Sequence, residues 1–349
     1  MPKSPFENMS NPLTKVEQLK AVSKTESIGF MSLLLVKKVV ERTAKNGSPF
    51  MTVDLADKTG SFGIVIFQDT PYFAFFKTEA PEGSAILLTG TTAYYQERFS
   101  PRVMDIRRLT KEEQKNYPME DLISASTENP IAMWDEIQAH VAKIKDEALR
   151  KTVLTVLEEE GDKFKIYPGG SSMHHAYRHG LMEHTLHLLR VAEALFPIYP
   201  EVNQDLTRAG LVLHDMGKVY EYDYDMTAKF SKLGTLHGHV VIGYRLARGA
   251  GLKNGLDAEL LARLEHIILS HQGELDFGSP VRPATPEAVF VSYIDDMDAK
   301  MGAVQNALRQ AGEKDEFADV PALAKSMGMG SKARLLLTPI GGDAANTGQ

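Results

Sequence analysis

Residues 209–218 read AGLVLHDMGK, a run of small and apolar residues that ends in a histidine, an aspartate and a lysine. A charged residue that follows such a run is expected to be buried, and a buried charge must be paired or must bind a metal ion. Neighbouring helical residues point about 100° apart, so His214 and Asp215 can share an ion that sits between their directions. Lys218 lies on the same helical face as Asp215, where a cation would stabilise negative charge on a bound phosphate.

The histidines gather around this stretch. The chain has 11 histidines and no cysteine, and ten of the histidines lie between His174 and His271. Without thiolates, a metal ion must be held by imidazole and carboxylate groups. A lone histidine is more often a solvated or hydrogen-bonded residue, and the acidic segment at 293–298 could be an exposed turn. The clusters are His174-His175 with His184, His214-Asp215, His237-Gly238-His239, His266 with His271, and Asp295-Asp296 with Asp298.

The composition describes a globular protein of 349 residues with 43% hydrophobic and 24% charged residues, long enough for two domains. The net charge of −7 argues against nonspecific nucleic-acid binding over the whole surface, so any positive binding surface must be local. The longest apolar run, at 28–40, is interrupted by Ser32 and Lys37-Lys38 and is too short to span a bilayer. The first residues do not resemble a signal peptide. We therefore expect a cytoplasmic protein with no membrane partner.

Two types of periodicity divide the chain. Residues from about 25 to 110 contain short alternating runs separated by turn signals, Lys45-Asn46-Gly47-Ser48-Pro49 among them, and predict a small barrel or sandwich of strands. Residues 109–129 are charged and then polar, which is typical of a linker. From residue 130 onward, apolar residues recur at steps of three and four and predict helices.

The order His184, then His214-Asp215, then Asp295 resembles the HD superfamily of metal-dependent phosphohydrolases, and HDMGK at 214–218 is similar to its HD-x-G-K motif. The resemblance implies that His184, His214, Asp215 and Asp295 ligate one metal ion. Asp295 is preferred to Asp296 because it closes the apolar run, as the last aspartate of that superfamily does.

Superfamily members with two metal ions carry further histidines, and His239 and His271 resemble these. Many members have two adjacent histidines where this chain has His271-Gln272, so a second ion would be held by fewer ligands. His266 is also a candidate ligand. It lies five residues before His271, which places it about 140° around a helix, so both could serve one ion only if the helix ended between them.

A narrower resemblance covers most of the chain. HHAYRHGLMEHT at 174–185 resembles the HHA-x-x-G-G-L-L-E-H-T signature of the YhaM-type 3′→5′ exoribonucleases, with His179 in place of a glycine. The start of this signature is shared with HD-type conjugative relaxases. Further similar segments are 213–218, 266–271, 277–280 and 293–301, and 45–60 resembles the first hairpin of the family's N-terminal OB-fold.

These resemblances imply an α+β multidomain chain with an N-terminal small β-barrel followed by an all-α helical domain. The expected parts are an OB-fold nucleic-acid-binding domain at 20–112, a linker and bridging helix at 113–150, an HD-type metal-dependent phosphohydrolase domain at 151–325 and a flexible tail at 326–349.

OB-folds bind single strands by stacking bases on aromatic rings beside a basic groove. The aromatic candidates include Phe67 and Tyr94, although strand alternation should place about half of such rings in the core. The residues that we expect to bind nucleic acid are Phe50, Tyr95, Phe99, Arg98 and Arg102.

The predicted function is divalent-metal-dependent 3′→5′ exonuclease activity on single-stranded RNA, with single-stranded DNA left open. Asp215 and Lys218 would act at the phosphate, and His175 would place or protonate the leaving group. One or two ions are expected, with Mn²⁺ favoured and Mg²⁺ or Fe²⁺ as alternatives. The competing hypotheses are hydrolysis of small or cyclic nucleotides and a nucleic-acid-binding protein with a weakened HD site. The resemblance also implies a homo-oligomer.

Overall fold

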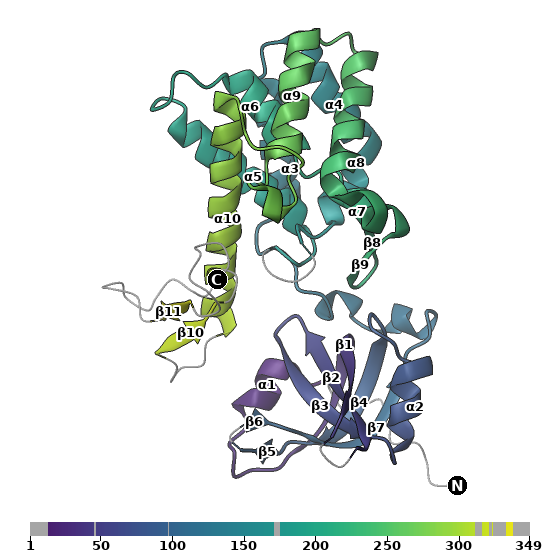
Figure 1. Cartoon of the computed structure of the whole chain (residues 1–349). Coiled ribbons are helices and arrows are strands. Elements are labelled where there is room, and N and C mark those ends of the chain that lie inside the picture. The colour runs from purple at the N-terminus through teal and green to yellow at the C-terminus, as the bar shows by residue number, and fades with distance from the viewer. Residues whose placement is uncertain are drawn as a thin grey trace. The chain divides into compact units, whose positions relative to one another are not determined.

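A computed structural model of the chain describes residues 13–44, 47–96, 98–170, 175–310, 316–320, 323 and 333–337. The chain divides into two compact units, residues 1–125 with 224–227, and residues 126–223 with 228–349 (Figure 1). We call them the sheet unit and the helical unit. Within the described residues, no helix is both long and apolar enough to cross a membrane.

The sheet unit is built on five antiparallel strands in the order β3-β2-β1-β4-β7. Its long first strand pairs with β2 along its second half and with β4 along its first half, and the register shifts between Val36 and Lys38. Its elements are α1 (Val16–Ala21), β1 (Gly29–Thr43), β2 (Pro49–Asp57), β3 (Gly60–Phe67), α2 (Pro71–Thr78), β4 (Ala85–Thr91), β5 (Tyr94–Tyr95), β6 (Arg98–Phe99), β7 (Arg102–Arg108) and the 3₁₀ helices η1 (Glu113–Asn116) and η2 (Met119–Asp121).

Strand alternation sets the core of this unit. Along β3, Phe62, Ile64 and Ile66 are buried, while Val65 and Phe67 point to the other face and are exposed. The β2–β3 hairpin closes at the pair Asp57↔Gly60, where the sequence predicts a turn. In the other predicted turn, Lys45 and Asn46 lie outside the described residues.

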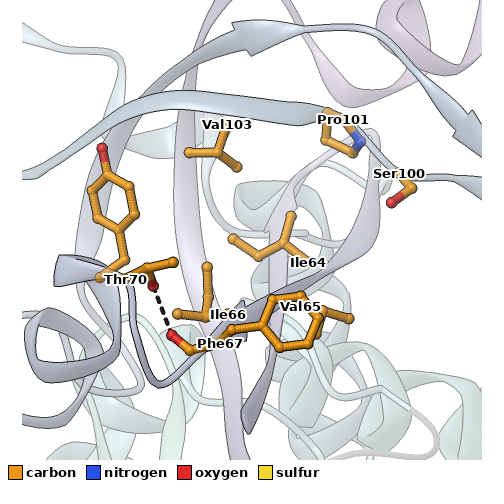
Figure 2. A pocket seen from close by; sticks show the side chains of 9 residues that line it. Ile64, Val65, Ile66, Phe67, Thr70, Ser100, Pro101 and Val103 are labelled. Atoms are coloured by element: carbon orange, nitrogen blue, oxygen red, sulfur yellow. Dashed lines mark hydrogen bonds between the residues drawn. The ribbon is translucent and has the colours of Figure 1, made fainter.

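The predicted OB-fold is confirmed in its five-stranded antiparallel sheet, but no hydrogen-bonded ladder closes it into a barrel within the described part of the unit. The two outer strands are β3 and β7. Between them lies a pocket of about 310 Å³ (Figure 2). It is lined by Ile64, Val65, Ile66, Phe67, Thr70, Tyr72, Ser100, Pro101 and Val103.

The helical unit contains the predicted helices. Side chains cap several of them at the N-terminus, as when Asn203 accepts from the amide of Leu206 and Ser231 accepts from the amide of Gly234. The elements are α3 (Pro130–Ala142), α4 (Glu147–Ile166), α5 (Gly180–Leu195), α6 (Gln204–Leu213), α7 (Lys218–Glu221), β8 (Tyr222–Tyr224), β9 (Ala228–Phe230), α8 (Lys232–Lys253), α9 (Ala258–Ser270), η3 (Leu275–Phe277), α10 (Pro286–Gln310), β10 (Phe317–Asp319) and β11 (Arg334–Leu336).

The expected linker at 113–150 contains η1, η2, α3 and the start of α4. Most of the expected flexible tail at 326–349 lies outside the described residues, and within it Arg334–Leu336 forms β11, which pairs with β10. Helices α5, α6, α9 and α10 pack against one another. Several of the histidines and aspartates that the sequence singled out lie on these helices or at their ends, so the packing of the four helices positions the site.

Candidate metal centre

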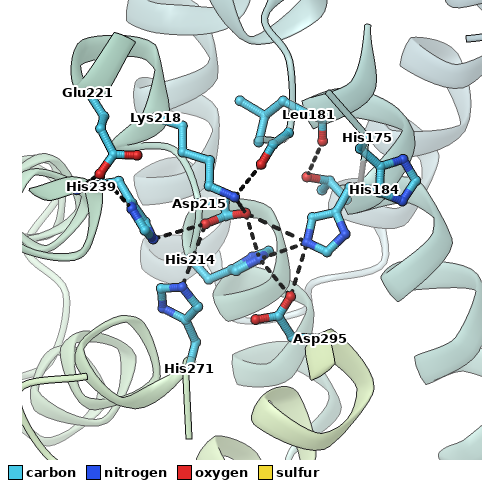
Figure 3. A network of polar contacts seen from close by, with 12 residues as sticks. His175, Leu181, His184, His214, Asp215, Lys218, Glu221, His239, His271 and Asp295 are labelled. Atoms are coloured by element: carbon cyan, nitrogen blue, oxygen red, sulfur yellow. Dashed lines mark hydrogen bonds and ion pairs between the residues drawn. The ribbon is translucent and has the colours of Figure 1, made fainter. Parts of the chain in front are cut away.

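Asp215 lies at the middle of a buried polar cluster (Figure 3). Helix α6 ends at Leu213, His214 follows as its C-terminal cap, and His214 and Asp215 are 0% and 3% exposed. One oxygen of Asp215, Oδ2, lies 3.6 Å from Nε2 of His184 and 3.5 Å from Nε2 of His214. Asp295 on α10 completes this group, with its Oδ1 at 3.2 Å from Nε2 of His184 and 3.9 Å from Nε2 of His214. We call these four residues the first ion position.

The other oxygen of Asp215 faces two further histidines. Its Oδ1 lies 3.5 Å from Nε2 of His239 and 3.6 Å from Nε2 of His271. This oxygen is buried and has no hydrogen-bond partner among the described residues. A buried carboxylate oxygen without a partner is costly, because it has lost its hydration without replacement. We call Asp215, His239 and His271 the second ion position, and Asp215 lies between the two positions.

Hydrogen bonds at the far side of each ring hold these histidines in place. His214 and His271 each donate from Nδ1 to a backbone carbonyl one helical turn earlier, at Leu211 (2.8 Å) and Ile268 (2.7 Å). A carbonyl can only accept, so the proton of each ring must be on Nδ1. Their Nε2 atoms therefore present lone pairs to Asp215, which is the tautomer that binds a metal ion.

Carboxylates serve the same purpose for the other two rings. Nδ1 of His184 lies 2.7 Å from Oδ2 of Asp298, and Nδ1 of His239 lies 2.9 Å from Oε1 of Glu221. Glu221 also accepts from the backbone amide of His239. Gly238 makes this possible, because its φ of +66° breaks the regular turn of α8 just before His239.

The donor set fits divalent ions. It consists of imidazole nitrogens and carboxylate oxygens without sulfur, which suits manganese, iron, magnesium and similar ions. Burial lowers the pKa of His184, but Asp295 and Asp298 raise it to about 10, so without a cation this ring tends to hold a proton between the carboxylates. A metal ion can take the place of that proton. The residues present therefore fit one ion at the first position and one at the second.

Asp298 belongs to this cluster, although the sequence analysis gave it no role of its own. Its carboxylate accepts from three imidazoles, at 2.7 Å from His184, 2.8 Å from Nε2 of His175 and 3.2 Å from Nδ1 of His187. Burial would raise the pKa of Asp298, but these hydrogen bonds hold it well below its usual range. The available signal was its place one helical turn after Asp295, on the same face of the predicted helix.

The structure places His175 differently from its predicted role beside a leaving group. The ring is buried, and its Nε2 contacts Asp298 while its Nδ1 lies 3.0 Å from the hydroxyl of Tyr177. Nδ1 also lies 3.4 Å from Oε2 of Glu183. Both ring nitrogens thus face protein groups, and this arrangement makes His175 a support for Asp298.

Lys218 also differs from its predicted contact with phosphate. It is buried, and it donates to Oδ2 of Asp215 at 2.6 Å and to the carbonyl of Gly169. A carboxylate oxygen has two lone pairs, so Asp215 can accept from Lys218 and still ligate an ion. In this geometry Lys218 fixes the orientation of Asp215.

His266 is not brought into either ion position. Its Nε2 accepts from the backbone amide of Ala284 at 2.8 Å, and burial lowers its pKa. The reason is that α9 continues to Ser270, so His266 and His271 leave the helix in different directions. Asp296, which we ranked below Asp295, forms an ion pair with Lys300 instead.

The predicted nucleic-acid-binding residues lie in the sheet unit and do not form one group. Phe99 is half-buried and packs edge-on against Phe62 and Tyr94, so it belongs partly to the core. Phe50 is half-buried and lies directly across from Phe67 on the neighbouring strand. Tyr95, Arg98 and Arg102 are exposed.

Comparison with known proteins agrees with this centre. The HD domain family matches residues 181–300. The chain is 31% identical over 277 residues to the 3′-5′ exoribonuclease YhaM of Geobacillus sp. (strain WCH70), which covers 79% of this chain and 84% of that protein. It is 30% identical over 277 residues to the 3′-5′ exoribonuclease YhaM of Bacillus subtilis (strain 168), with 79% and 87% covered.

Among solved structures, a mitochondrial single-stranded DNA binding protein from S. cerevisiae, Rim1, is 16% identical, covers 24% of this chain and 96% of its own, and has a TM-score of 0.21. The two curated relatives extend over both units, and the HD match contains His184, His214, Asp215, His239, His271 and Asp295. The chain therefore belongs to the YhaM 3′-5′ exoribonuclease family.

Proposed function

We propose that the chain is a divalent-metal-dependent 3′→5′ exonuclease that shortens single-stranded RNA. The observation that carries this proposal is the convergence of four imidazole Nε2 atoms on the carboxylates of Asp215 and Asp295, with Oδ1 of Asp215 buried and otherwise unpartnered. The relatives that match most of the chain are named as 3′-5′ exoribonucleases, which supports RNA as the substrate.

The centre contributes positioning and electrostatics. When bound, divalent ions supply the Lewis acidity that activates water and neutralises charge on a phosphodiester. Lys218 and Asp298 hold Asp215 and His184 in fixed orientations, so little reorganisation is needed during the reaction. Burial of His214 and Asp215 keeps bulk water from competing for these groups.

A strand-binding face on the sheet unit supports a single-stranded substrate. Phe50 pairs with Phe67 on β3 and with Arg42 on β1, and directly paired residues of antiparallel strands lie on the same face. The adjacent positions Met51 and Ile66 are buried, so this row points away from the core. Two rings beside a guanidinium can stack bases and attract the phosphate backbone. We call this set of two rings and one guanidinium, formed by Arg42, Phe50 and Phe67, the aromatic row.

We further propose manganese as the preferred ion, because every donor is nitrogen or oxygen, and the cytoplasm as the site of action. Self-association is a proposal as well. It is supported by Tyr293, Met297 and Met301, which are exposed at steps of four residues along α10.

The direct test is degradation of 5′-labelled single-stranded RNA by the purified chain with manganese. We expect a ladder that shortens from the 3′ end, no reaction with chelator, and no reaction of the Asp215→Ala variant. Cyclic dinucleotides and nucleoside triphosphates are assayed in parallel, and single-stranded DNA of the same sequence measures the preference for RNA. Hydrolysis of the small nucleotides alone would refute the proposal, and tight RNA binding without any turnover would indicate a binding protein.

A further inference from the structure

The side-chain amide of Gln272 lies against both histidines of the second ion position. Its Nε2 is 2.9 Å from Nε2 of His271 and 3.4 Å from Nε2 of His239. Those two rings carry their protons on Nδ1, where they donate to the carbonyl of Ile268 and to Glu221. Their Nε2 atoms are therefore acceptors, and the amide must present its NH₂ group to them. Gln272 donates into the lone pairs that an ion at the second position would use.

At the first ion position, the donor that contacts a ligand is Lys218, which binds Oδ2 of Asp215, and among the described residues no side-chain amide contacts an imidazole Nε2 there. Nε2 of His184 and Nε2 of His214 face carboxylate oxygens, those of Asp215 and Asp295. Two carboxylates therefore meet at the first position, whereas the second position has only Oδ1 of Asp215. Since the attraction of a divalent ion increases with the negative charge of its ligands, the first position should bind more tightly.

We infer that the two ion positions are unequal: the first holds a resident ion, and the second holds an exchangeable ion that must displace the amide of Gln272. This inference rests on the metal-dependent function proposed above and adds how the centre is loaded. Each hydrogen bond from the amide to an imidazole opposes ion binding, because it is lost when the ion enters. The net value of one such bond corresponds to about a fivefold change in affinity.

A metal count tests the inference independently of activity. The full-length chain is loaded with manganese, desalted into metal-free buffer and analysed by atomic spectroscopy, and manganese is then titrated back. We expect the wild-type chain to retain about one ion, with a second ion binding at least about tenfold more weakly. In Gln272→His an imidazole replaces the amide and adds a ligand, so about two ions should be retained.

The Gln272→Ala variant tests whether the Gln272 amide competes with the second ion or binds it as a ligand. Loss of the amide should strengthen binding of the second ion about fivefold or more, and Gln138→Ala, the same change on α3 outside both ion positions, should leave both affinities unchanged. Two equally retained ions in the wild-type chain, or weaker second-ion binding in Gln272→Ala, would overturn the inference. Retention as expected in a chain that does not shorten RNA would instead reject the proposed function.

Discussion

The helical unit buries the polar groups that matter for its chemistry, whereas the sheet unit exposes the aromatic groups that we propose for binding. His214 and Asp215 are almost completely buried, but Phe67 is 59% and Tyr95 is 69% exposed. In the helical unit, packing and hydrogen bonds fix each donor atom. In the sheet unit, strand pairing fixes the backbone position of each aromatic residue, but not the orientation of its exposed ring. Under the proposed function, we expect the helical unit to determine turnover and the sheet unit to determine affinity for the strand.

The largest effect is expected from the first ion position. Asp295→Asn removes one of its two carboxylates, and the loss of several kcal/mol of ion-dependent stabilisation should lower the turnover of RNA by about 10³-fold or more. Its neighbour gives a matched control, because Asp296 pairs with Lys300 and belongs to neither ion position. Asp296→Asn should retain nearly full activity in the same single-turnover assay. Equal losses in the two variants would show that general charge on α10, rather than the buried centre, supports activity.

A smaller effect is expected where the buried network acts through a ligand. Asp298 holds His184 through Nδ1, and groups that orient a ligand in this way typically change metal affinity or activity by about 10- to 100-fold. Asp298→Asn should therefore weaken manganese binding by that factor in a titration, and Asp298→Glu should restore part of it. A purely structural role would lower the melting temperature and leave the affinity unchanged, which would contradict the assignment.

The same difference explains how far the sequence could be interpreted. The burial of His214, Asp215 and Asp295 could be predicted because each follows an apolar segment, where a charged group needs a partner. His184 was selected only through the resemblance to the HD superfamily. Asp298 was not selected because three histidines reach it from a loop and from α5, and such tertiary contacts leave no local pattern.

The direction of a side chain was a second feature that could not be predicted from the sequence. The sequence indicated that Gln272 departs from the usual histidine, but not that its amide contacts two imidazoles. Lys218 was expected at a phosphate because its spacing from Asp215 is correct, yet the same spacing also allows the direct bond that forms. In the sheet unit, alternation could not say whether Phe99 points inward, because the register of the short strand β6 follows from its pairing with β5.

The binding face of the sheet unit should show a moderate effect that is confined to affinity. Phe67→Ala removes one ring of the aromatic row, and a base stacked on an aromatic side chain contributes about 1–3 kcal/mol, so RNA affinity should fall about tenfold. The maximal rate on saturating RNA should stay unchanged. Met104→Ala is the control, because this side chain on β7 is also exposed and apolar but has no ring. A fall in the maximal rate with unchanged RNA affinity would contradict the assignment of strand binding to the sheet unit and turnover to the helical unit.

The smallest effect concerns buried charge in the scaffold of the helical unit. Burial raises the pKa of Glu193, but its hydrogen bond to the buried guanidinium of Arg208 (2.8 Å) lowers it to about 2. A lowered folded-state pKa means that the stabilisation is complete above the ordinary value of about 4.5 and is lost as the pH falls toward 2.

Glu193→Gln should therefore cost about 2 kcal/mol of unfolding free energy at pH 7, and the difference from the wild-type chain should shrink between pH 4.5 and pH 2 in urea titrations. Glu259→Gln breaks an exposed pair with Arg263, which water and salt screen, and should leave stability nearly unchanged at any pH. If the two variants changed the unfolding free energy equally, burial would not determine how much an ion pair stabilises the helical unit. The contrast between buried polar groups in the helical unit and exposed side chains on the sheet unit would then not explain their different effects.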